Sequence, residues 1–192
     1  MPVRLDLVER SAPITRREVV VVAVVGSALS AILIWRIFGG LASAVTADSR
    51  DPLLEAWSIA WSGHALVHQP LQFFDANAFW PLSKSLAFSD SLAGYAPVGL
   101  LGAGTTAALV HYNLLFLFSY ALAFTGAYLL ARELGVSRLA ALAAGCAFAW
   151  TPARTAQMPH LHVLSSGGIP LALFLLLRGW RRHSAWTVLA GC

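Results

Sequence analysis

Long apolar runs separated by short charged clusters dominate the pattern of hydrophobic and polar positions. A helix needs roughly 20 mostly apolar residues to cross a hydrocarbon core of roughly 30 Å. Membrane spans are expected at about residues 19–38, 113–132, 137–151, 164–178 and 184–192. The pattern therefore predicts an all-α fold, a polytopic membrane helix bundle. Residues 1–18 would form a cytoplasmic N-terminal segment and residues 19–192 the transmembrane domain.

A different pattern fills residues 40–112, where polar residues interrupt the apolar sequence. Within this loop, Trp57, Trp61, His64 and His68 recur at i, i+4, i+7 and i+11. Such spacing places side chains on one narrow face of a helix. The stripe predicts an amphipathic helix on the membrane surface, with its tryptophans at the level of the headgroups. Interfacial anchoring and packing are the simplest roles for these rings. The alternative is that His64 or His68 is a catalytic base or a ligand, and His64 is a candidate for substrate binding.

Residues 92–110 decide the topology. They are apolar enough to span, but glycine and proline interrupt them at Gly94, Pro97, Gly99, Gly102 and Gly104. If they crossed, the arginine clusters at residues 132–138 and 178–182 would lie outside, against the positive-inside rule. If they form a broken, non-spanning element, both clusters lie inside with the N-terminal arginines. We favour the second arrangement, which makes residues 40–112 a long outer loop with non-spanning helices.

Composition supports a membrane protein. The chain is 58% hydrophobic and 11% charged, whereas soluble domains carry about 25% charged residues. The thirteen Lys and Arg residues are scattered near the ends of apolar runs, so the net charge of +4 indicates topology and not nucleic-acid binding. The two cysteines predict neither a disulfide framework nor a metal site. Residues 186–192 resemble the opening of another apolar helix, so we expect the N-terminal part of a longer, truncated protein.

Carboxylates after the first span are candidates for catalysis. Asp51 precedes Pro52, where it could be a helix N-cap or a general base. Asp48 stands three residues earlier, and two nearby carboxylates could share a divalent cation or a proton. A solvated loop is the simpler interpretation of Asp48. Asp90 precedes the broken segment and could cap it or contact substrate.

Basic residues follow the third span, in a second outer segment at residues 151–166. Arg154, His160 and His162 suit a phosphate, because Arg offers a bidentate fork and His a hydrogen bond near neutral pH. Solvation at the membrane interface is the alternative. The His160-x-His162 pair alone is a weak metal signal, and no metal site is predicted. Sequence motifs for nucleotide binding, HExxH and GxSxG are absent.

This layout resembles the N-terminal part of the GT-C superfamily of membrane glycosyltransferases. The resemblance rests on an Asp shortly before an amphipathic helix, the sequence His68-Gln69-Pro70, a non-spanning element, and a span ending in residues 131–135. It implies that the essential Asp of the first outer loop corresponds to Asp51 and less well to Asp48. That residue would act as general base or hold a metal. The family often carries an acidic motif in the second outer loop, but residues 151–166 contain no Asp or Glu.

The resemblance implies transfer of a sugar from a polyprenyl-phosphate donor to an acceptor on the outer face of a bacterial inner membrane. The partners would be this lipid-linked donor and the bilayer. No cofactor is certain, and a divalent cation is possible. The residues expected to bind substrate are Arg154, His160, His162, His64 and Asp90. A non-enzymatic transporter, flippase or assembly subunit is the alternative, because glycine-broken segments are also found in transporters.

Overall fold

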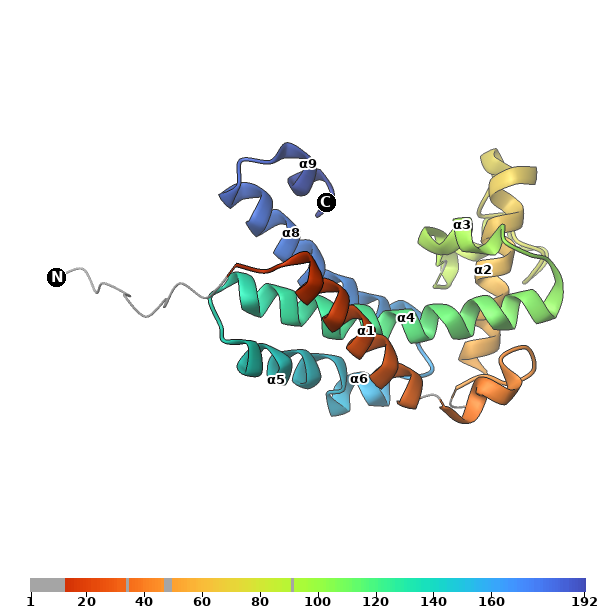
Figure 1. Ribbon diagram of the computed structural model, residues 1–192. Helices are drawn as coiled ribbons and strands as arrows, with labels where there is room; N and C mark the ends of the chain where they lie inside the picture. The colour runs from red at the N-terminus through yellow and green to blue at the C-terminus, as the bar shows by residue number, and fades with distance from the viewer. Residues whose placement is uncertain (1–12, 34, 47–49, 91) are drawn as a thin grey trace. The chain divides into compact units, whose positions relative to one another are not determined.

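The computed structural model describes residues 13–33, 35–46, 50–90 and 92–192, and these residues contain helices and no strand (Figure 1). The all-α class is therefore confirmed. The α-helices are α1 (Arg16–Leu33), α2 (Asp51–His68), α3 (Ala96–Gly99), α4 (Gly104–Glu133), α5 (Arg138–Ala149), α6 (Pro152–Ala156), α7 (Leu161–Leu164), α8 (Ile169–Arg181) and α9 (Ala185–Leu189). Short 3-10 helices are η1 (Trp35–Gly40), η2 (Pro70–Gln72), η3 (Ser85–Phe88), η4 (Ala93–Tyr95) and η5 (Ser165–Gly168).

Two helical stretches of the described chain are long and apolar enough to cross a membrane, Gly104–Glu133 and Leu161–Arg181. Both begin earlier than the sequence pattern indicated. α4 starts at Gly104, whose φ of +83° suits glycine at the turn into the helix. α5 has 12 residues, and α9, within the expected span at 184–192, has five.

The chain divides into two compact units. The first unit comprises Met1–Leu33, Leu117–Thr155 and Ser165–Cys192, and the second comprises Ile34–Phe116 and Ala156–Leu164. α4 contributes residues 104–116 to the second unit and residues 117–133 to the first.

The first unit is built around aromatic side chains of α4. Phe124 and Tyr128 belong to a buried cluster that also contains Val22 of α1, Ala141 of α5 and Phe174 of α8. At the cytoplasmic end predicted from the sequence, Glu18 accepts hydrogen bonds of 2.8 Å from both Tyr128 and Arg132. Arg138 reaches the same carboxylate at 3.3 Å. A buried carboxylate is stable there because charged and polar donors surround it.

The second unit joins α2 to the segment that the sequence predicted to be broken. That segment is indeed interrupted: η4, α3 and the start of α4 replace one continuous helix. α3 packs on α2 at Gly63 and Gly99, where a Cβ on either glycine would lie well under 3.0 Å from backbone atoms. Asn113 of α4 donates to the carbonyl oxygens of Leu41 and Ala44, at 2.9 and 2.8 Å. These contacts hold α3 close to α2 and join α4 to residues 41–44.

Candidate functional site

Asp51 is the first residue of α2, and its carboxylate faces a histidine. Arg50 occupies the N-cap position and makes no side-chain cap hydrogen bond, and Pro52 follows in the first turn. The N-cap interpretation of Asp51 is therefore wrong. Instead, Asp51 Oδ2 lies 3.1 Å from Nε2 of His160, and the two side chains are 49% and 35% exposed. An accessible carboxylate–imidazole pair can accept and donate protons at a solvent-facing surface.

Glu55 lies one turn further along α2 and is only 4% exposed. Its Oε2 accepts the backbone N–H of Leu161 at 2.7 Å, and its Oε1 lies 2.6 Å from Nδ1 of His162. The N–H of His162 reaches Oε1 at 3.4 Å. These donors compensate the cost of burying a charged carboxylate. Glu55 therefore fastens residues 160–162 to α2.

Asp90 completes a carboxylate–histidine cluster, which we define as Asp51, Glu55, Asp90, His160 and His162. Asp90 Oδ2 lies 3.6 Å from Nδ1 of His162. The rings of His160 and His162 meet edge to face with their centroids 5.6 Å apart. All five residues belong to the second unit.

Helix geometry on α2 and the burial of Leu161 place most of the cluster's side chains. Residues four apart share a helix face, so α2 directs Asp51 and Glu55 to the same side. Leu161, which separates the two histidines in sequence, is fully buried and anchors their segment.

In the described chain, no three or more His, Cys, Asp or Glu side chains are arranged to hold a metal ion. The geometry supports proton transfer and hydrogen bonding.

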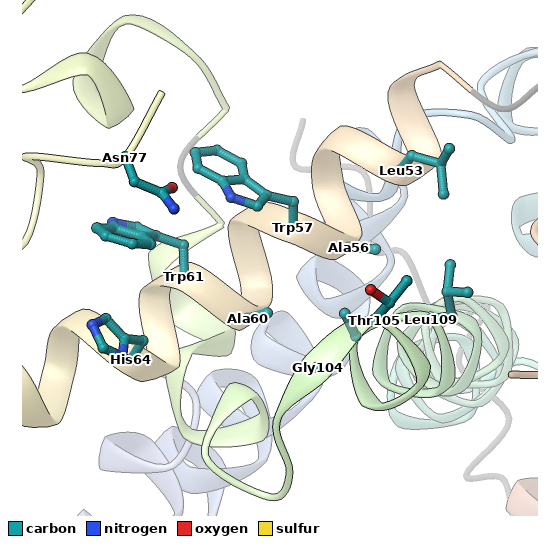
Figure 2. Close-up of a pocket in the computed structure, with 11 residues that line it drawn as sticks. Leu53, Ala56, Trp57, Ala60, Trp61, His64, Asn77, Gly104, Thr105 and Leu109 are labelled. Atoms are coloured by element: carbon teal, nitrogen blue, oxygen red, sulfur yellow. The ribbon is translucent and has the colours of Figure 1, made fainter. Parts of the chain in front are cut away.

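A groove of about 400 Å³ follows another face of α2 (Figure 2). Trp57, Trp61 and His64 line it on α2, and Thr105 and Leu109 of α4 lie across from them. Figure 2 also shows Asn77 beside the two tryptophans. The groove is mostly apolar with a few polar groups at its edge, as is common in ligand sites.

A second cavity, of about 540 Å³, shares Ala60, His64 and Gly104 with this groove and extends to His68. Together the two cavities follow α2 from Leu53 to His68, which is about 20 Å at the helical rise. His64 therefore stands where they join.

The aromatic stripe predicted from the sequence forms a stack along this face. Ring centroids are 6.2 Å apart for Trp57 and Trp61, 5.2 Å for Trp61 and His64, and 4.5 Å for His64 and His68. Among the described residues, the buried indole Nε1 of Trp61 has no hydrogen-bond partner. A buried donor without a partner is costly, so this atom is a candidate contact for a ligand oxygen.

Arg154 belongs to the first unit, and the cluster does not include it. Its side chain is nearly buried, donates to Ser166 Oγ at 3.0 Å, and lies 5.6 Å from the ring centroids of Tyr120 and Phe148. Burial lowers the pKa of its guanidinium, although the charge of Tyr120 acts in the opposite direction. Packing accounts for this residue better than the phosphate contact expected from the sequence.

Asp48 lies outside the described residues. Glu55 was not predicted as a site residue, although the sequence carries a signal for it. An acidic residue one turn after Asp51, between apolar neighbours, must be buried with a partner if the helix packs against protein.

Comparison with protein-family models, with curated proteins and with solved structures gives no match for this chain.

Proposed function

We propose that this chain belongs to a multi-pass membrane glycosyltransferase of the GT-C type in a bacterial inner membrane. It would transfer a sugar from a polyprenyl-phosphate donor to an acceptor hydroxyl on the outer face. The observation that carries this proposal is the contact of 3.1 Å between Asp51 and His160. Two helical stretches able to cross a membrane support the location.

Asp51 is the general base of the proposed reaction. A carboxylate can only accept, so we assign a proton to Nε2 of His160, which then orients the carboxylate. Asp51 removes the proton of the acceptor hydroxyl as its oxygen attacks the anomeric carbon of the sugar. The bond between that carbon and the phosphate oxygen breaks, and the lipid phosphate leaves with the bonding electrons. Attack opposite the leaving group inverts the anomeric centre, as in inverting hydrolysis.

Glu55 and His162 act as positioning residues. The buried Glu55 carboxylate binds two backbone N–H groups and one imidazole of residues 161–162. His160 immediately precedes this fastened stretch. Glu55 thus holds His160 within reach of Asp51, and Asp90 supports His162 from the solvent side. Orientation of this kind is a large part of the catalytic effect of a proton-transfer group.

The groove along α2 accommodates the lipid part of the donor. Its apolar lining suits isoprene units, and it begins at Leu53, two residues from Asp51 in sequence but on another face of α2. His64 is exposed and lines both cavities, but it lies 13 residues beyond Asp51 on α2, about 20 Å at the helical rise, so it would contact the lipid part of the donor and not the reacting phosphate.

Sugar transfer is tested with the chain in proteoliposomes, a polyprenyl-phosphate donor carrying a radiolabelled hexose, and extracted membrane acceptors. Asp51→Asn should lower the rate about 100-fold or more, the usual contribution of a general base, while membrane insertion stays normal. His160→Asn should lower the rate as well. His183→Asn is the matched control, because His183 is exposed in the first unit and its φ of +50° is tolerated by Asn.

A wild-type rate in Asp51→Asn would remove the assignment of the base. Movement of intact lipid-linked sugar across the bilayer, without release of polyprenyl phosphate, would instead show a flippase.

A further inference from the structure

The segment that follows α2 exposes three large apolar side chains within four consecutive residues. Phe79 is 62% exposed, Trp80 90% and Leu82 49%. We call residues 78–84 the loop tip. Single exposed apolar residues are common on protein surfaces, but adjacent ones that include a tryptophan mark an interaction surface.

Hydrogen bonds close the base of this loop. Asp75 Oδ1 accepts the backbone N–H of Lys84 at 2.5 Å, and the N–H of Leu86 donates to the carbonyl of Phe74 at 3.1 Å. Gln69 donates to the carbonyl of Asp75 at 2.9 Å. Leu86 is buried beneath these bonds. Hydrogen bonds therefore connect the two ends of the loop and hold the loop tip in a defined conformation.

The backbone of the tip adopts a conformation that bulky residues rarely take. Phe79 has a φ of 61° and Lys84 a φ of 54°. Left-handed backbone at a residue with a large side chain is unfavourable, and it persists where the surroundings determine it. Such positions concentrate at functional sites. Here they bracket the exposed apolar side chains.

The charge of the tip indicates what covers it. Residues 78–84 contain one lysine and no acidic residue. Tryptophan and phenylalanine beside a basic residue are typical of the membrane–water interface, where the rings sit among headgroups and the cation meets anionic lipid. The same unit contains the beginning of α4, a helix long and apolar enough to cross a bilayer.

We infer that the loop tip inserts Phe79, Trp80 and Leu82 into the headgroup region of an anionic bilayer and so fixes the second unit at the lipid surface. This inference does not depend on sugar transfer, because it follows from the exposure, backbone and charge of the loop.

Insertion is tested by replacing Trp80 with cysteine in a Cys146→Ser, Cys192→Ser background and attaching an environment-sensitive fluorophore. The labelled chain is reconstituted at low protein content in vesicles of phosphatidylcholine and phosphatidylglycerol. We expect blue-shifted emission, loss of most of the fluorescence when the vesicles contain lipid with a nitroxide at the top of the acyl chain, and protection from aqueous iodide.

Gln72→Cys is the matched control, because Gln72 is exposed at the base of the same loop. Its label should respond to iodide and little to the nitroxide lipid. If Trp80→Cys does not fold, Leu82→Cys replaces it. Iodide quenching at positions 80 or 82 equal to that at 72, with no nitroxide effect, would show the tip in water and leave it as a protein-binding surface, which overturns the inference.

Discussion

The carboxylate of Glu55 lies 2.6 Å from Nδ1 of His162, although 107 residues separate the two in sequence. The same carboxylate accepts the backbone N–H of Leu161. One buried side chain thus holds a distant segment against α2, and His160, which lies 3.1 Å from Asp51, immediately precedes that segment.

Glu55→Ala should destabilise the protein by about 1–3 kcal/mol, since buried N–H groups and an imidazole would lose their acceptor. Thermal unfolding in detergent measures this loss. Sugar transfer should fall together with stability, and Glu55→Gln should lie between the wild type and Glu55→Ala. Asp90→Asn provides the comparison for stability: Asp90 is 56% exposed and 3.6 Å from the same histidine, so its change should stay within about 0.5 kcal/mol. Equal losses in Glu55→Ala and Asp90→Asn would refute the anchoring role.

Gly63→Ala should weaken the contact between α2 and α3. A Cβ at Gly63 would meet the backbone of Gly99 well under 3.0 Å away. Backbone cannot move aside as a side chain can, so a cost of about 1–3 kcal/mol is expected. Gly94→Ala is the control, because nothing lies within 4 Å of its added Cβ. Chemical denaturation monitored by tryptophan fluorescence compares the two variants, and an equally stable Gly63→Ala would contradict the close packing.

Acid should remove stability that Glu18 supplies. Glu18 stands in the first turn of α1, before the apolar run that begins at Val19. Burial raises the pKa of this carboxyl, but hydrogen bonds from Arg132 and Tyr128 and the charges of Arg132 and Arg138 outweigh burial, so its pKa lies below the ordinary 4.5. A lowered pKa in the folded state means that the stabilisation is complete above the unfolded value and is lost as pH falls through the folded value.

Glu18→Gln provides the test of this linkage. The difference in melting temperature between the wild type and Glu18→Gln should be largest at pH values above 4.5 and shrink below it. Melting curves recorded in detergent from neutral pH into the acid range show the trend. A difference in melting temperature that does not change with pH would show that the charge of Glu18 does not stabilise the protein.

The membrane topology predicted from the arginine clusters places Leu101 outside and His183 inside. Leu101 is 78% exposed, just before α4, and His183 is exposed just after α8. Single cysteines at these positions, in a background without Cys146 and Cys192, should react with an impermeant maleimide in intact cells at position 101 only. Labelling of position 183 in intact cells, or of both positions only after lysis, would reject the non-spanning assignment of residues 92–110.

Local pattern was enough to predict several features. Apolar runs indicated α1, α4, α5 and α8, though not their ends, and glycine and proline indicated the interruption around α3. The spacing of Trp57, Trp61, His64 and His68 predicted that these side chains share one face of α2, where successive rings lie close together. Each of these features depends on residues close together in sequence, so the local pattern of residue types is enough to predict it.

The contacts between distant segments could not be predicted in this way. The helical, largely apolar character of the chain followed from its sequence, as did Asp51, His160 and His162 as separate candidates. The folded chain adds that Asp51 contacts His160, that Glu55 is buried against His162, and that Arg154 lies among aromatic rings. These pairings depend on which helix faces pack together, because no period in the sequence records which faces come into contact.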